Sequence, residues 1–413
     1  MRLLRTLILA GGISIAVHGA TPRTDINPAL IYFKAFTVVP DLSEADRDYL
    51  YKGDWRNKQL DNRFGELVTK YDNEFKVLRK AGESKAACDW GLDISEGPEA
   101  LLPALAKAKF ASQTACLRAR WFLQNGKEQD AINDLLSTFV LARNVSRDGV
   151  IISALVQIAM ENIITGFIAE NFYQFTDQGL QQLIADIDAA PTRGTMRQCL
   201  PVEKAGFGDW FIHKVEEFRA RNGGDEEKTL AEIRRLYLTN ISDEGEKDTG
   251  FPDRWIAAVG GTSEGVLNSL REMDAYYREA DRILQLPPAQ FETAVKVLQQ
   301  KIEADPKLIA GKWFPFLGKA GMKEFGALVK LAMFHAAIQY RLNGEQGLKS
   351  VIDPAGTEPF SLERFTFEGA DRGFKLKSKL NYVWNDSLIF VESPGAPFYI
   401  EGPNAGKPIS AEK

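Results

Sequence analysis

The sequence predicts a mainly α-helical protein, made of stacked helix hairpins in an irregular or solenoid-like array and closed by a small antiparallel β module. Three observations lead to this fold class. Apolar residues recur every three or four positions through most of residues 27–342, which is the spacing of one helix face. A glycine break at 125–126 joins two such segments into a hairpin. Residues 351–413 change to short β-prone runs around turns.

The helical part is divided by breaks in the apolar pattern. Pro28 and Ser43 have the residue types that begin helices, and the breaks near 191–194, 222–224 and 241–265 end others. In chain order we expect helices at 27–39, from 43, at 59–81, from 99 to 172, at 180–187, within 195–240, and at 266–284, 288–303 and 321–342. Strands are expected within 364–378, 387–392 and 397–402. We predict four parts: a signal peptide (1–20), an N-terminal helical lobe (21–190), a second helical lobe (191–350) and a β-rich module (351–413).

The hairpin at residues 117–144 is the clearest local pattern. Gly126 suits its turn, because glycine accepts a positive φ without a Cβ clash. A glycine followed five residues later by the small Ala131 resembles one tetratricopeptide hairpin. Three positions depart from that family's pattern, namely Glu128, Thr138 and Arg143. Since no second copy follows at the family's period of about 34 residues, we expect a stack of hairpins without a regular repeat.

Residues 150–169 are apolar on nearly every face and, at about 1.5 Å per residue, long enough to cross a bilayer. Gln157, Glu161 and Asn162 stand in the middle of this segment. A central acidic residue costs roughly 2.5 to 3.5 kcal/mol on insertion. The pattern therefore favours a helix buried at the centre of the protein.

The first residues have the pattern of a secretory signal peptide. Arg2 and Arg5 are followed by an apolar run from Leu7 to Val17 and by the small pair Gly19-Ala20. We therefore expect a periplasmic or secreted protein without an integral membrane segment after cleavage. The formal charge is −5, and it becomes −7 once the two arginines are removed. This balance predicts no nucleic-acid partner and no polybasic surface for anionic lipid.

The three cysteines leave two readings open. In an oxidising compartment Cys88 and Cys116 could pair as a disulfide. Alternatively, these two and Cys199 are small buried thiols. Without clustered histidines, three cysteines do not indicate a zinc site, and we expect no cofactor.

Several short segments resemble a group of uncharacterised exported helical proteins of bacteria. The resemblance lies in CDWGLDISEGPEALLPALAKA at 88–108, DPAGTEPF at 353–360 and GFKLKS at 373–378. It covers most of the chain after the signal peptide. It implies a helical fold and an exported location, and it implies no chemistry.

Asp-Trp pairs occur at 54–55, 89–90 and 209–210. A carboxylate beside an indole ring suits a sugar-binding cleft, in which the ring stacks on the sugar and the acid accepts hydroxyl hydrogen bonds or transfers a proton. The favoured alternative is that each aspartate caps a helix and each tryptophan packs in its first turn. Candidate binding residues are Trp90, Glu96 and Trp210, and the candidate catalytic carboxylates of the sugar reading are Asp89, Asp93 and Asp209.

The loop at 88–99 gathers acids that could act as an acid–base pair or hold calcium, although they lack the calcium-loop spacing, and solvated loop acids are the favoured reading. Glu203, His213 and Glu217 could form part of a metal site, but the zincin spacing is absent, so a surface ion-pair network is favoured there. His335 stands in an apolar helix, and no GxSxG motif nominates a serine nucleophile.

Two function hypotheses follow from these patterns. The first is an exported, non-enzymatic binding or scaffold protein that presents a helical groove to a peptide or protein partner. The second is an all-helical protein that binds or cleaves glycans, with the carboxylates and tryptophans above in its cleft. Two carboxyls roughly 5 to 10 Å apart beside an exposed aromatic ring would favour the second hypothesis.

Overall fold

The computed structural model describes residues 25–56, 58–240, 249–309, 315–380, 386–394, 398–401 and 404–409. Within these ranges it contains fifteen α-helices and one three-stranded sheet, which confirms a mainly α fold with a small β module near the C-terminus. The segment expected to be a signal peptide, residues 1–20, lies outside the described residues.

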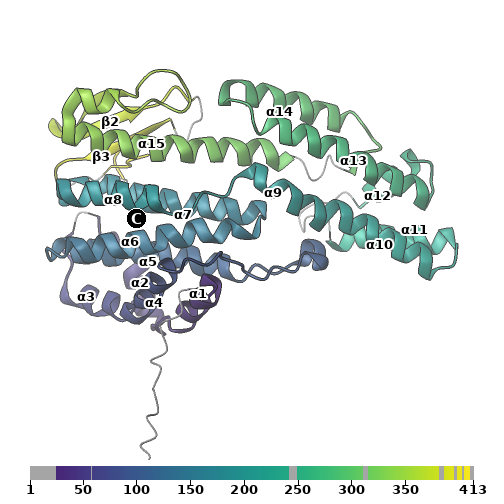
Figure 1. Ribbon diagram of the computed structural model, residues 1–413, viewed down its shortest axis with the longest axis horizontal. Coiled ribbons are helices and arrows are strands. Elements are labelled where there is room, and N and C mark those ends of the chain that lie inside the picture. The colour runs from purple at the N-terminus through teal and green to yellow at the C-terminus, as the bar shows by residue number, and fades with distance from the viewer. Residues whose placement is uncertain are drawn as a thin grey trace, which may run out of the picture.

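The molecule consists of a layered body and an arm (Figure 1). The lowest layer of the body holds α1 (Pro28–Thr37), α2 (Glu44–Lys52), α3 (Asn62–Thr69) and α4 (Asp72–Gly82). Above it lie the hairpin α5 (Ala104–Gln124) and α6 (Glu128–Val145), then α7 (Ile151–Glu170) and α8 (Asp177–Ala189). The long helix α15 (Pro315–Lys349) and the sheet cover the top.

The arm extends from the end of α8 and returns through α15 (Figure 1). Its helices are α9 (Met196–Glu203), α10 (Trp210–Arg221), α11 (Glu226–Asn240), α12 (Phe251–Ala258), α13 (Ser263–Ile283) and α14 (Pro288–Glu303). A π-helical turn, η4 (Lys204–Asp209), joins α9 to α10 without a break in direction. The sequence predicts a break between helices at 241–265, but the described part of this segment includes the helix α12, in which Trp255 and Ile256 are buried.

Several helices begin at residues of the types that favour helix starts. Pro28 occupies the first turn of α1, and the Ser43 side chain accepts the Asp46 N–H at the start of α2. Side chains cap α3, α8, α9 and α13 in the same way, through Asp61, Thr176, Thr195 and Thr262. These bonds satisfy backbone N–H groups that have no partner inside the helix.

The hairpin is formed as its spacing predicts. Gly126 has φ = +68° in the turn, and Ala131, Ile132, Leu135 and Phe139 of α6 are buried. Among the described residues one helix, α7, is long and apolar enough to cross a membrane, and 61% of its apolar window is buried inside the protein. It packs against α5, α6 and α15.

One predicted helix is interrupted. Residues 59–81 form α3 and α4 with a break at 70–71, so the expectation of a single helix was wrong. The cause is Arg118 of α5, whose Nη1 donates to the Val68 carbonyl and pairs with Asp72 Oδ1, both at 2.7 Å. A buried guanidinium therefore occupies the point where the helix would continue.

Arg118 also bridges α5 to α6. Its Nε lies 2.7 Å from Asp134 Oδ2, and Arg79 of α4 pairs with the other oxygen at 2.8 Å. We call Asp72, Arg79, Arg118 and Asp134 the interior network. Glu74 lies beside it, 1% exposed, and neither of its carboxylate oxygens has a hydrogen-bond partner. Burial raises the pKa of Glu74 to about 7.

Three large apolar cores hold the fold. One joins α1–α4 to α5 and α6, and a second joins the hairpin, α7, α8, most of α15 and the sheet. The third fills the arm, around Phe211, Trp255 and Phe291. Because the second core includes residues on both sides of positions 190 and 350, packing crosses both predicted domain boundaries. Those boundaries stay predictions of domain organisation.

The sheet has the order β1-β2-β3 and is antiparallel throughout, with β1 (Ser361–Phe367), β2 (Ala370–Lys377) and β3 (Ser387–Val391). Glu368 and Gly369 both have positive φ in the two-residue turn between β1 and β2, as a type I′ hairpin requires. The predicted strand at 397–402 contributes only isolated bridges at its described positions. Phe374 and Phe390 pack against Phe172, which fixes the sheet on the end of α7.

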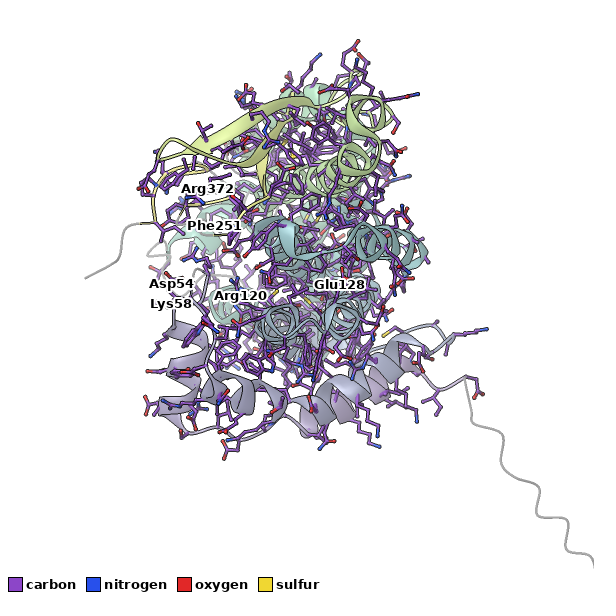
Figure 2. The ribbon with its side chains drawn as sticks, turned by 90° about the vertical axis from the view of Figure 1, so that its left-hand side faces the viewer. Asp54, Lys58, Arg120, Glu128, Phe251 and Arg372 are labelled. Atoms are coloured by element: carbon purple, nitrogen blue, oxygen red, sulfur yellow. The ribbon has the colours of Figure 1, made fainter. Side chains whose placement is uncertain are left out.

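Polar side chains tie the layers together. Arg120 of α5 pairs with Glu170 of α7 at 3.1 Å and donates to the Arg56 carbonyl at 3.2 Å. Glu128 at the start of α6 accepts the Thr176 N–H at 2.7 Å, at the start of α8. Figure 2 shows both residues at mid-height, between the N-terminal helices and the sheet. The three cysteines are free thiols; Cys199 is buried, as the second reading of these residues expects, whereas Cys88 and Cys116 are half-buried.

Candidate functional site

The segment from residue 84 to residue 103, between α4 and α5, is not a simple loop. We call it the strap, because Figure 1 shows it leaving the body, crossing toward the arm below α9, and returning to the start of α5. Its near end is fixed to α1: Asn27 Nδ2 donates to the Asp89 carbonyl at 2.6 Å, and the Asp89 N–H donates to Asn27 Oδ1 at 3.1 Å. Ser84 Oγ donates to the Ile26 carbonyl at 2.7 Å.

The far end of the strap is a short 3-10 helix, η1 (Ile94–Glu99), docked on the arm. Gly97 has φ = +66°, and the Trp210 ring lies where its Cβ would stand. Asn240, at the end of α11, donates to Glu99 at 2.5 Å. Only glycine permits both this φ and this close approach, so Gly97 fixes the place at which the strap meets the arm.

A pocket of about 260 Å³ lies at the base of the strap. One wall is Phe33 of α1, another is the end of α6 with the turn to α7, and the strap and the start of α5 supply the remainder. Its apolar lining includes Phe33, Trp90, Leu92, Leu101, Leu102, Leu105 and Val145. Three carboxylates, Asp93, Glu96 and Asp148, also line it, and no lysine, arginine or histidine is among its described lining residues. The pocket is therefore apolar in its walls and acidic in its charge.

Trp90 is held by contacts inside the protein. Its Nε1 donates to the Asn144 carbonyl at 2.8 Å, its ring stacks on Tyr32 at 5.8 Å, and Phe33 meets it edge-on at 5.4 Å. Asn144 Nδ2 in turn donates to the Tyr32 hydroxyl at 3.0 Å. Trp90 therefore forms a rigid wall of the pocket, with most of its ring engaged by α1.

Asp148 is the most enclosed acid of the pocket. It lies in the turn between α6 and α7, where Oδ1 accepts the Val150 N–H at 3.0 Å and Oδ2 accepts the Ser153 hydroxyl at 2.6 Å. Burial raises its pKa above the ordinary aspartate value, and these two hydrogen bonds offset only part of that effect. The sequence analysis did not single out this residue, because an Asp-Gly pair between helices reads only as a turn.

The other two acids of the pocket lie on the strap. Asp93 precedes η1, and its Oδ1 accepts the Ser95 N–H at 2.9 Å. Hydrogen bonds from Ser95 hold the pKa of Asp93 below its usual range. Glu96 is exposed on η1. The structure thus places the predicted residues Trp90, Asp93 and Glu96 in one pocket.

The remaining predicted residues of the loop and the arm lie elsewhere. Asp89 Oδ1 accepts the Gly91 N–H at 2.9 Å, which stabilises a turn of the strap. Asp89 itself does not line the pocket. Asp209 pairs with Lys204 at 2.6 Å. Trp210 is 9% exposed and packs against Phe211 and Gly97. Of the carboxylates proposed for sugar chemistry, Asp93 alone lines the pocket.

The three Asp-Trp pairs do not cap helices as the favoured reading expected. Asp54 accepts the Arg56 N–H at 3.4 Å in a turn after α2, Asp89 stabilises the strap, and Asp209 lies inside the continuous run from α9 to α10. The packing part of that reading does hold for Trp55 and Trp210, which contact other aromatic rings. Each aspartate therefore precedes its tryptophan for a different structural reason.

The residues that the sequence analysis considered for a metal site do not come together. Glu203 Oε1 accepts the Ile151 N–H at 2.7 Å at the start of α7, and burial raises its pKa. Glu217 pairs with Lys214 at 3.1 Å, and the hydrogen bond from Lys214 lowers its pKa. Within the part of the chain that the structure describes, no three His, Cys, Asp or Glu residues are placed to hold a metal ion.

Three large apolar side chains are exposed on α1 and the strap, two of the elements that form the pocket. Leu101, which lines it, is 80% exposed, and Ile94 on η1 is 37% exposed. Leu30 is 64% exposed and stands three residues before Phe33 on the same face of α1. We call Leu30, Ile94 and Leu101 the apolar rim.

Comparison with known proteins finds no matching family model, no matching curated protein and no matching solved structure. The resemblance to exported bacterial helical proteins stays a prediction.

Proposed function

We propose that this chain is an exported binding protein that takes a segment of a peptide or protein partner into the pocket at the base of the strap. The observation that carries the proposal is the apolar rim beside a concave, rigidly walled pocket. Exposed apolar groups gathered at a cavity favour an interaction site, whereas single exposed apolar residues need no explanation. The proposed site lies at the base of the strap. It therefore differs from the groove between hairpins that the sequence suggested.

The size of the pocket supports a partner's side chain as its occupant. Clefts for small molecules usually measure about 300–1,000 Å³. A pocket of about 260 Å³ falls just below this range and suits one inserted side chain, with the rest of the segment lying on the rim. Fixed walls reduce the entropy lost on binding, because Trp90 and Asp148 are already held by hydrogen bonds.

Binding of a short glycan is the second candidate, since Trp90 shares the pocket with Asp93 and Glu96. The contacts of Trp90 with Tyr32 and Phe33 leave little of its ring for a sugar, and Trp210 is buried. Titration with cello-, chito- and malto-oligosaccharides, followed by Trp fluorescence, tests this candidate. The Leu101→Ser variant, introduced below as the test of the peptide proposal, serves here as well. Saturable glycan binding that this variant retains would favour the glycan.

The peptide proposal is tested by selecting a display library of random heptapeptides on the immobilised protein. We expect enrichment on the wild type and loss of binding by Leu101→Ser, which removes the most exposed apolar side chain of the rim. Val297→Ser is the matched control, because Val297 is 60% exposed on α14, in the arm. Failure to enrich any sequence, or equal binding by Leu101→Ser, would overturn the proposal.

Export is tested separately, by fractionating cells that express the full chain. We expect the protein outside the cytoplasm, with Thr21 as its first residue. A cytoplasmic protein with Met1 intact would overturn this part and leave the pocket unaffected.

A further inference from the structure

The three acids of the pocket have no basic partner among the described residues. Asp93, Glu96 and Asp148 are absent from the ion pairs of the described residues, and the lining contains no base. Arg147, next to Asp148 in the chain, is engaged elsewhere: it donates to the Thr192 carbonyl and hydroxyl, both at 3.0 Å.

Asp148 has acceptor capacity that the protein does not use. An ionised carboxylate offers about four lone-pair sites, and this one accepts a single N–H and a single O–H. The residue lines a pocket whose other lining is largely apolar, and beside apolar walls an ion pair is stronger than in water. An entering cation would meet a carboxylate already oriented by Val150 and Ser153.

We propose that the partner segment is anchored by a lysine or arginine side chain, which enters the pocket and pairs with Asp148 while neighbouring apolar residues of the segment cover Leu101 and Ile94. This inference rests on the proposed function and specifies its chemistry. The apolar stem of such a side chain matches Phe33, Trp90 and Leu102, and its charged end matches the Asp148 carboxylate in the same lining. Glu96, at the exposed edge, raises the local concentration of cationic segments before they enter.

The test uses the same heptapeptide selection, now read for composition. We expect the enriched peptides to contain one lysine or arginine beside apolar residues. One enriched peptide is then synthesised, and its Kd is measured by fluorescence anisotropy. Asp148→Asn keeps an acceptor oxygen for the Val150 N–H, and its amide group can donate to Ser153 Oγ. The substitution removes the charge, so we expect affinity to fall at least about tenfold. Replacing the peptide's basic residue by glutamine should cause the same loss.

Two controls separate charge from structure. Glu203→Gln alters the other carboxylate that accepts an N–H at the start of α7, and Glu203 does not line the pocket. Glu99→Gln alters an acid of η1 outside the lining, in contrast to Glu96→Gln inside it. We expect less than about a twofold change from either control. Circular dichroism of each variant checks that the helices are intact.

The outcomes distinguish this inference from the proposed function. Peptides without basic residues that bind Asp148→Asn as well as the wild type, yet fail to bind Leu101→Ser, would overturn the cationic anchor and leave the peptide-binding function standing. No enrichment would overturn both. If 1,4-diaminobutane displaced the peptide completely and bound Leu101→Ser as tightly as the wild type, the pocket would be a site for free amines, and the anchor proposal would fail.

Discussion

Buried acids occur in two regions of this protein, and their surroundings differ. In the interior network, Asp134 is shared by Arg79 and Arg118, and Asp72 completes the pairing. In the pocket, Asp148 is enclosed by apolar walls and accepts only an N–H and an O–H. The first arrangement holds four helices in register, and the second leaves a carboxylate open to a cavity. The two regions therefore differ in whether a buried carboxylate meets a guanidinium.

The largest expected effect comes from breaking the interior network. Arg118→Met should lower the free energy of unfolding by about 3–5 kcal/mol, because it leaves Asp134 buried with one partner and frees the Val68 carbonyl. Urea denaturation measures this change. Arg282→Met is the control, since its exposed pair with Glu279 contributes at most about 1 kcal/mol. Equal effects of the two substitutions would contradict a structural role for the network.

Glu74 extends the comparison between paired and unpaired acids, because it is an unpaired acid that lies beside the paired acids of the interior network. Burial raises its pKa from 4.5 to about 7, so the native state holds the proton more tightly than the unfolded chain. Its contribution to stability is therefore greatest at low pH and decreases as pH rises between about 4.5 and about 7, by at most about 3 kcal/mol. Urea midpoints measured across this window should fall for the wild type and vary less for Glu74→Gln. A decrease of the same size in both proteins would assign the pH dependence to other groups.

The pocket wall depends on packing of the strap and not on charge. Gly97→Ala should destabilise the docked strap by about 2 kcal/mol, because the new Cβ meets the Trp210 ring at a positive φ. Gly91→Ala is the matched control: Gly91 has φ = +67°, but nothing lies within 4 Å of the added Cβ, so only the backbone cost of about 1 kcal/mol applies. Limited proteolysis of the strap and Trp fluorescence report the difference. Equal protection in the two variants would show that the strap does not need this contact.

The smallest expected effect is at Asp148 itself. Burial raises its pKa, so above that pKa the ionised form carries an unfavourable desolvation energy in the native state. Asp148→Asn keeps one acceptor oxygen for the Val150 N–H, can donate from its amide to Ser153 Oγ, and removes the charge, so it should stabilise the unliganded protein at about pH 8 by less than about 1 kcal/mol. Thermal unfolding at this pH measures the change. A clear loss of stability would mean that the charge is needed for folding.

Much of the helical fold could be predicted because its signals are local. The Gly126 turn, the caps at Ser43 and Thr262 and the apolar spacing of α6 each depend on residues only a few positions apart. The break between α3 and α4 could not be predicted, because its cause is Arg118, which is 50 residues from Val68 in the chain. The same local reading placed Trp90, Asp93 and Glu96 together, since all three belong to one loop.

The sequence indicated only part of the candidate site. Asp148 and Phe33 come from other elements and complete the pocket, while the predicted Asp209 is engaged by Lys204. A hint was present in the Asp-Gly pair at 148–149 between two strongly apolar helices. Without the distance from that turn to the strap, the pair indicates only a turn.

The sequence by itself determined the fold class, the hairpin and the concentration of acids in one loop, because periodicity, capping and turn chemistry act over a few residues. The tertiary structure alone decided which acids are paired. Arg118 reaches Asp72 and Asp134 from a third helix, whereas no base in the described part of the chain pairs with Asp148. Whether a carboxylate meets a guanidinium or a cavity depends on contacts between distant segments, and the same residue type gives no sign of that in the sequence.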